Sequence, residues 1–256
     1  MGQHFAGIDI GSRTIELVIV DKAGTIIENF QRDTGYNPMS EVDSLLSQVS
    51  YDAIMATGYG RNLFELSIEA RTVTEIKAHA RGAMATFPGV RTVLDIGGQD
   101  SKVISLSETG RVSRFEMNDR CAAGTGKFLE IMAKSLGYRI EDFGNEALAA
   151  KKDITISSMC TVFAESEVTS LIGRGEDCRE IALGLHDSVV RRVSGMIRRV
   201  SATDAGELVF TGGVARNPCI RMLLERTLDR EIQVAEDPQL IGAYGAALLA
   251  LESALQ

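Results

Sequence analysis

Short apolar runs alternate with longer stretches of helical apolar periodicity along this chain, and the pattern predicts strands and helices in turn. The clearest strands are predicted at residues 5–10, 15–20, 92–96, 102–106 and 207–211. Helical spacing of apolar residues marks 74–86, 126–136, 140–152, 161–172, 181–200 and 240–251. Shorter strands are predicted at 51–57 and 154–156. Alternation of this kind favours a layered α/β fold.

The opening of the chain is repeated later in the sequence. Residues 9–12 read Asp-Ile-Gly-Ser and residues 95–98 read Asp-Ile-Gly-Gly, an offset of 95 − 9 = 86 residues. In both copies a glycine turn joins two apolar strands. We interpret them as one duplicated strand–turn–strand unit, with chance similarity among common strand residues as the alternative. Two similar subdomains are therefore expected, at residues 1–90 and 91–256, and the last helix is free to pack back on the first.

Composition narrows the class of function without deciding it. Of the 256 residues 45% are hydrophobic, and the net charge is −8. Such a chain is globular and can bury a sizeable core. An acidic protein lacks the basic face that nucleic acid or an anionic membrane requires, so neither is expected as a partner. No apolar run approaches the roughly 20 residues of a membrane span, and a cytoplasmic location is expected by default.

Two of the four cysteines stand at similar places in the sequence. Cys121 precedes a Gly-x-Gly turn that opens a predicted helix, and Cys160 lies just before another. Helix starts suit an anion, which includes a phosphate, a thiolate or a thiolate-bound metal cluster. A buried cysteine beside an ordinary glycine turn is the alternative. A P-loop is excluded, because Phe128 follows Lys127 where that motif needs Ser or Thr.

Three glycine turns that follow predicted strands could let backbone N–H groups approach a phosphate. They are Gly11-Ser12, Gly97-Gly98 and Gly212-Gly213. Each is a weak signal alone, but Asp9 and Asp95 stand two residues before the first two turns. A pair of carboxylates facing one cleft suits Mg²⁺, which binds one or two carboxylates with phosphate and water. A turn-capping or ion-paired role is the alternative for each aspartate.

Five segments carry a resemblance to known proteins. They are residues 56–62 (ATGYGRN), 95–100 (DIGGQD), 117–126 (MNDRCAAGTG), 160–167 (CTVFAESE) and 211–217 (TGGVARN). The Asp-Ile-Gly hairpins and the last segment resemble the acetate and sugar kinase, heat-shock chaperone and actin superfamily. That resemblance implies a duplicated ribonuclease H-like fold with nucleotide in the cleft between two subdomains. The whole set resembles more closely the ATP-dependent activators of 2-hydroxyacyl-CoA dehydratases and their relatives, the ATPase subunits of benzoyl-CoA reductase.

The resemblance implies a homodimer with one four-iron, four-sulfur ([4Fe-4S]) cluster on its two-fold axis. Cys121 and Cys160 match the family's cluster ligands and lie, with the adenosine site, in the second subdomain. A cubane cluster needs four thiolates, and two-fold symmetry would turn two ligands into four. Cys178 and Cys219 match no such position, and we interpret them as a helix-flanking thiol and a packing residue.

The resemblance also implies that each subunit binds MgATP and hydrolyses it to ADP. Asp9 and Asp95 would position Mg²⁺ and water, and Gln99 is a hypothesis for orienting the attacking water. Phosphates are expected at Gly11, Ser12, Arg13, Thr14, Gly97, Gly98 and Gln99. The nucleotide site is also assigned Gly124 and Gly126, and the adenosine is expected at Gly212, Gly213, Asn217 and Gln239.

The implied function is ATP-driven transfer of one low-potential electron to a dehydratase-type iron–sulfur enzyme, with ferredoxin or flavodoxin as the donor. Three alternatives stay open. They are the ATPase subunit of a benzoyl-CoA reductase or related double-cubane reductase, a small-molecule (sugar) kinase of the same fold, and a chaperone-like nucleotide-dependent regulator. A kinase would need no cysteines.

Two positions depart from the family's pattern. Glu16 stands where these activators usually carry lysine, and Arg13 where they carry a small residue. A carboxylate near phosphate would oppose binding unless it faces away, and Arg13 could supply the displaced positive charge. His79 is expected on a solvated helix face, without a role.

Overall fold

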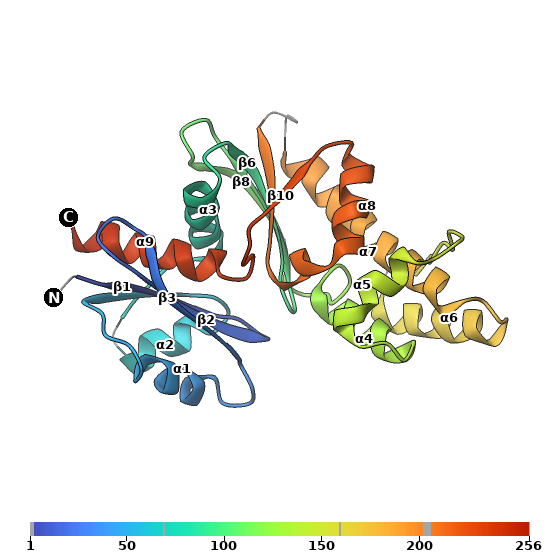
Figure 1. The fold of residues 1–256 in the computed structure, drawn as a ribbon, viewed down its shortest axis with the longest axis horizontal. Coiled ribbons are helices and arrows are strands. Elements are labelled where there is room, and N and C mark those ends of the chain that lie inside the picture. The colour runs from blue at the N-terminus through green and yellow to red at the C-terminus, as the bar shows by residue number, and fades with distance from the viewer. Residues whose placement is uncertain (1–2, 69, 159, 202–205, 256) are drawn as a thin grey trace. The chain divides into compact units, whose positions relative to one another are not determined.

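The computed structural model describes residues 3–68, 70–158, 160–201 and 206–255 (Figure 1). Contacts divide the chain into two compact units. The first unit comprises Met1–Val93, Ile104–Ser113 and Ala235–Gln256, and the second comprises Leu94–Val103 and Arg114–Val234. The subdomain boundary between residues 90 and 91 stays a prediction. Among the described helices, none combines the length and the apolar character that crossing a membrane requires.

The first sheet grows from the predicted opening hairpin. Its strands are β1 (Phe5–Ile10), β2 (Thr14–Val20), β3 (Ile26–Asp33), β4 (Ala53–Thr57) and β5 (Arg71–Thr72). β1 pairs antiparallel with β2 and parallel with β4, which gives the order β3-β2-β1-β4-β5. β1 and β2 are buried along almost their whole length, because both faces of the sheet are covered.

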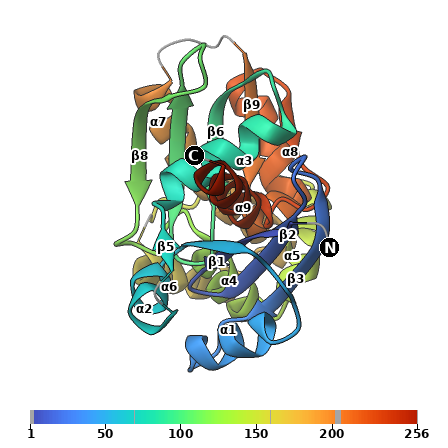
Figure 2. The same cartoon turned by 90° about the vertical axis from the view of Figure 1, so that its left-hand side faces the viewer.

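Helices cover both faces of this sheet. α1 (Pro38–Leu46) and α2 (Arg61–Ile68) lie on one face and α9 (Ile241–Ala254) on the other, and α3 (Glu75–Thr86) packs against α9. α1 and α2 pack with Ile8 and Ile10, while α9 packs with Phe5 on the opposite side of β1. α9 also lies beside α3 (Figures 1 and 2). A Cβ at Gly7 would clash with the α9 backbone, so glycine permits this close packing.

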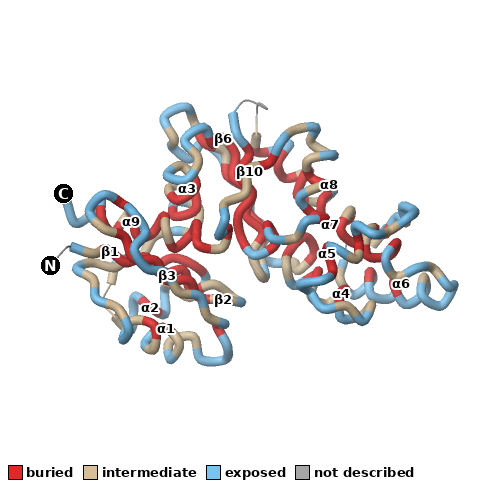
Figure 3. The backbone as a smooth tube through the Cα atoms, in the orientation of Figure 1, coloured by how far each residue is buried: buried red, intermediate tan, exposed pale blue. Residues whose placement is uncertain are grey.

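The second sheet repeats the first. Its strands are β6 (Val90–Ile96), β7 (Ser101–Leu106), β8 (Val112–Asn118), β9 (Glu207–Thr211) and β10 (Ile232–Val234). Their order is β10-β9-β6-β7-β8. Taken from its opposite edge, this is the order of the first sheet, with β6 to β10 in the places of β1 to β5. The repeated order confirms the predicted duplicated α/β fold. Buried residues concentrate on the central strands of both sheets (Figure 3).

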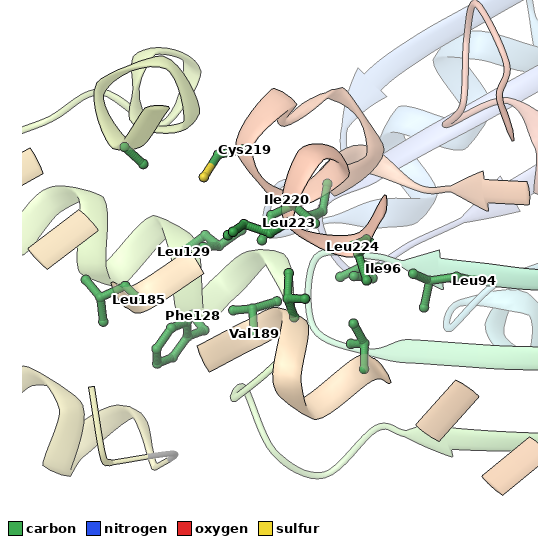
Figure 4. Close-up of a cluster of buried hydrophobic side chains, with 14 of the residues drawn as sticks. Leu94, Ile96, Phe128, Leu129, Leu185, Val189, Cys219, Ile220, Leu223 and Leu224 are labelled. Carbon is green, nitrogen blue, oxygen red and sulfur yellow. The ribbon is translucent and has the colours of Figure 1, made fainter. Parts of the chain in front are cut away.

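The remaining helices belong to the second unit. They are α4 (Gly126–Ser135), α5 (Ile140–Leu148), α6 (Thr161–Gly173), α7 (Cys178–Val200), the short 3₁₀ helix η1 (Gly213–Arg216) and α8 (Pro218–Leu228). Phe128 of α4, Leu185 of α7 and Leu223 of α8 share one core with Leu94 of β6 (Figure 4). α7 begins three residues before its predicted start, because the Asp177 side chain caps it by accepting a hydrogen bond from Arg179 N at 2.8 Å.

The strand predicted at residues 154–156 is wrong. The segment has no regular structure, and its polar and apolar groups contact α7 instead. Ile156 O accepts a hydrogen bond from the Arg191 guanidinium at 2.7 Å, and Gly184 leaves room for Ile154 O. A short apolar run therefore packs on a helix without joining a sheet.

Candidate functional site

In the first unit, the Asp9 carboxylate lies near the end of β1 and is almost buried. His79 of α3 places Nε2 3.7 Å from Asp9 Oδ2. Gly242 of α9 lies directly against both side chains, and a Cβ there would clash with Asp9 Oδ2. The expectation of a solvated His79 is therefore wrong, because the histidine is only 5% exposed and contacts the predicted Mg²⁺ ligand.

Glu16 does not face away from Asp9. The two residues are directly opposed in the β1–β2 register, so their side chains share one face of the sheet. Glu16 is 5% exposed, and its Oε1 accepts a hydrogen bond from Gln31 Nε2 at 3.1 Å. The residue that departs from the family pattern thus adds a second buried carboxylate beside the first.

The turn after β1 closes on itself. Gly11 N donates to Thr14 O at 3.0 Å, and Gly11 O accepts a hydrogen bond from Thr34 Oγ1 at 2.8 Å. Ser12 is half-buried and Arg13 is exposed. The four predicted phosphate residues therefore lie together on one turn, and Gly11 uses its own N–H to close it.

In the second unit, the Asp95 carboxylate is held from two sides. Thr211 Oγ1 donates to Asp95 Oδ1 at 2.8 Å, and Lys102 Nζ lies 3.1 Å from Asp95 Oδ2. Lys102 also pairs with Asp100, and its side chain is 3% exposed. Lys102 matches Glu16 at the repeat offset, since 102 − 16 = 86. The sequence signal that could have found it was a lysine inside an otherwise apolar strand.

The turn after β6 is joined directly to the start of α4. Gly97 N donates to Asp100 O at 3.0 Å. The carbonyl of Gly97 accepts Gly126 N at 2.9 Å, and that of Gly98 accepts Lys127 N at 2.7 Å. Two of the N–H groups at this helix start are therefore engaged by the predicted phosphate turn. Gln99 is exposed on the same turn.

The predicted adenosine residues Gly212 and Gly213 lie between β9 and α8, and Asn217 caps α8. Gly212 has φ +84°, and a Cβ there would clash with Ile96 O, so only glycine fits. Asn217 Oδ1 accepts Cys219 N at 3.0 Å and Ile220 N at 3.1 Å. Both bonds belong to the helix cap, which gives Asn217 a structural role whatever it does for the nucleotide.

A buried histidine holds the other end of the Asn217 amide. Asn217 Nδ2 donates to His186 Nε2 at 3.0 Å, and His186 Nδ1 donates to Ala182 O at 2.7 Å. Burial lowers the pKa of His186 to about 4, so the ring is neutral near pH 7. This contact could not be predicted from the sequence, because His186 is a single residue on the buried face of a long helix. Gln239 is half-buried in the first unit, before α9.

All four cysteines are free thiols in different surroundings. Cys160 is the N-cap of α6 and is exposed, and Cys121 is half-buried in the loop before α4. Cys178 begins α7. Cys219 is fully buried, and burial raises its pKa to about 12, so it stays a protonated packing residue. Among the described residues, no group of three or more His, Cys, Asp or Glu could hold a metal ion.

Residues 6–250 match the BadF/BadG/BcrA/BcrD ATPase family. The chain belongs to this family of ATPases.

Two relatives of this ATPase match along nearly the whole chain. The (R)-2-hydroxyglutaryl-CoA dehydratase activating ATPase of Acidaminococcus fermentans is 41% identical over 263 residues, covering 99% of each protein. The 2-hydroxyisocaproyl-CoA dehydratase activator of Clostridioides difficile is 39% identical, covering 97% of this chain and 95% of that protein. The solved activator of the 2-hydroxyisocaproyl-CoA dehydratase from Clostridium difficile with bound ADPNP superposes with a TM-score of 0.90 at 38% identity, covering 100% of this chain and 96% of that one.

Proposed function

We propose that this ATPase is an ATP-dependent activator that delivers one low-potential electron to a 2-hydroxyacyl-CoA dehydratase-type enzyme. Support comes from the near full-length similarity to two named activators. The observation that carries the proposal is the presence of free thiols at Cys121 and Cys160, one before α4 and the other at the start of α6.

The thiol set fits half of a [4Fe-4S] site. Cys121 and Cys160 are free and accessible, whereas Cys219 is sealed in the core. Four thiolates are needed, so a second copy of the chain must supply the other pair. When bound, the cluster supplies a one-electron carrier. The N-cap position of Cys160 places the positive end of the α6 dipole at its thiolate, which lowers the cost of the negative charge there.

The carboxylates fit the chemistry of Mg²⁺, which accepts one or two carboxylates together with phosphate and water. Asp9 and Asp95 are the proposed carboxylates in each copy. Lys102 and Thr211 orient Asp95, and His79 lies against Asp9. The glycine turns with Ser12, Arg13, Thr14 and Gln99 are proposed to hold the phosphates, and Gly212, Gly213 and Gln239 to lie along the adenosine. Gly124 and Gly126 stay predictions for the nucleotide site.

Nucleotide hydrolysis is proposed to drive the transfer through conformational change. A donor such as ferredoxin or flavodoxin would reduce the homodimer. Each ~59 mV between donor and acceptor shifts a one-electron equilibrium tenfold, so a mild donor needs this coupling. The change can supply only the difference in binding free energy between ATP-bound and ADP-bound states.

The test is an anaerobic redox assay. Dithionite-reduced protein is mixed with an electron acceptor and with MgATP, MgADP or no nucleotide, and oxidation is followed by absorbance. Oxidation that speeds up only with MgATP is expected. ATP hydrolysis with no redox change would reject the activator function, and phosphate transfer to a sugar would identify a kinase.

A further inference from the structure

The loop that carries Cys121, defined here as the cysteine loop (residues 119–125), is held by the residue before it. Asn118 ends β8, and its Nδ2 donates to Cys121 O at 2.9 Å and to Ala123 O at 3.1 Å. The two N–H groups of the Asn118 amide thus donate to two carbonyls that are separated by one residue. The carbonyl between them, of Ala122, accepts Thr125 Oγ1 at 2.7 Å. Three consecutive carbonyls of the cysteine loop are therefore fixed by side chains.

Arg192 of α7 determines which way the Asn118 amide points. Its Nη2 lies 3.4 Å from Asn118 Oδ1, a long hydrogen bond between a cation and the amide oxygen. If the amide were flipped, its oxygen would face two carbonyl oxygens and its NH₂ would face the guanidinium. Both contacts would then be repulsive. Arg192 therefore favours the orientation in which Asn118 donates to the cysteine loop.

The same arginine also packs against the loop. Gly124 has φ +83°, and a Cβ there would come within 2.7 Å of Arg192 Cδ. Arg192 Nε is buried and has no hydrogen-bond partner among the described residues. A buried donor without a partner costs free energy, so the hydrogen bond from Nη2 to Asn118 and the packing against Gly124 must offset that cost. Its contacts with Asn118 and Gly124 give it a role in shaping the loop.

At its other end, the cysteine loop runs into α4, whose first N–H groups bond to the Gly97–Gly98 turn. The Cys121 backbone thus lies between two anchors, the Asn118–Arg192 pair and the turn that follows Asp95. A thiolate ligand must be held within about 0.5 Å of its working position, and side chains behind the ligand usually do this.

We propose that Asn118 is the positioning residue for Cys121 and that Arg192 fixes the orientation of its amide. The inference rests on the proposed cluster-binding function, because it assigns these residues to one of its ligands. Asn118 touches only the backbone of the loop in this arrangement, so it acts through Cys121.

The test compares Asn118→Asp with a matched control, Arg199→Gln. Arg199 also extends from α7 to β8, where it bonds Glu116 at 2.7 and 3.0 Å, but none of its hydrogen bonds or ion pairs among the described residues reaches the cysteine loop. In anaerobically reconstituted dimers, Asn118→Asp is expected to lose iron to a chelator at least about tenfold faster than wild type, the usual effect of removing support behind a metal ligand. Arg199→Gln is expected to match wild type.

A second readout needs no metal. In cluster-free protein at fixed pH, alkylation mapped by mass spectrometry is expected to be several-fold faster at Cys121 in Asn118→Asp and unchanged at Cys160. Arg192→Met, which keeps the length of the side chain, is expected to give the same selective change to a smaller degree and covers the case in which Asn118→Asp misfolds. Equal changes at both cysteines, or none in either variant, would overturn the inference. A wild-type protein that binds MgATP but no iron would instead reject the proposed function. The alkylation result would still test whether Asn118 positions Cys121.

Discussion

Acid should destabilise the second unit through His186, the buried residue that holds the Asn217 amide. The ring extends from α7 to the cap of α8 and is fully buried, and the Phe143 ring lies tilted against it with the ring centroids 4.6 Å apart. Burial lowers its pKa from 6.5 to about 4. Between these values the unfolded chain binds a proton that the folded protein does not. His186 therefore does not reduce the free energy of unfolding above about pH 6.5, and it reduces that free energy progressively as the pH falls from 6.5 toward 4.

The magnitude follows from the shift of the pKa. The difference is 6.5 − 4 = 2.5 units. At ~1.36 kcal/mol per unit the full effect is about 3 kcal/mol, of which about 2 kcal/mol appears between pH 7 and pH 5. His186→Gln removes the ionisation but keeps an oxygen that can accept the Asn217 N–H. This variant should therefore lose about 2 kcal/mol less than wild type over the same range.

The assay is urea unfolding of nucleotide-free protein at pH 7 and pH 5, for wild type and His186→Gln. Because two units can unfold separately, hydrogen exchange at the Cys219 and Ile220 amides should report the second unit, since both bond the Asn217 cap. Other acid-titrating groups are common to both proteins and cancel in the comparison. Equal pH dependence in the two proteins would refute the reasoning.

Three further substitutions test one residue of the first unit and two residues of the second. Gly242→Ala should displace the carboxylate of Asp9, which its Cβ would clash with, and slow phosphate release from ATP by up to about a hundredfold. Lys102→Met removes one partner of a buried ion pair and should lower the urea unfolding free energy by about 3–5 kcal/mol. Asn217→Ala should cost about 1 kcal/mol for the lost helix cap, and about 1–3 kcal/mol more because His186 loses its donor, in the same unfolding assay.

Each has a control on the same chain. Gly195→Ala adds a methyl group in α7 that would meet only the end of the Arg199 side chain, at 3.3 Å, so ATP hydrolysis should be unchanged. A similar loss in both glycine variants would contradict the role assigned to Gly242. Lys102→Arg keeps the charge and should lose less stability than Lys102→Met. Asn217→Asp keeps an oxygen for the helix cap and should retain more stability than Asn217→Ala.

Local features of the sequence were enough to predict the repeated hairpins. The apolar runs around Asp9 and Asp95 and the glycines that follow them are signals within a few residues of each other. β3 and β8, in contrast, are largely exposed, so neither shows the apolar run that marks a buried strand. Edge strands of this kind form because a neighbouring strand offers hydrogen bonds, which the sequence does not reveal.

The partners of the site residues depend on contacts between distant segments. His79 was expected on the solvated face of its helix, yet α9, over 160 residues later, covers it. Lys102 is buried in an apolar strand because two aspartates compensate its charge. Asn118 was visible only as part of a motif, whereas its hydrogen bonds explain why an amide stands there. Residue types were readable from the sequence, but their partners were not.

The measurement that tests the central claim most directly is the iron content and the mass of the protein purified without oxygen. Two identical chains should share about four iron atoms, and Cys121→Ala or Cys160→Ala should abolish that iron while nucleotide still binds. Cys178→Ala should keep it. A folded wild-type protein that is monomeric and free of iron, or a Cys121→Ala variant with wild-type iron, would contradict the account.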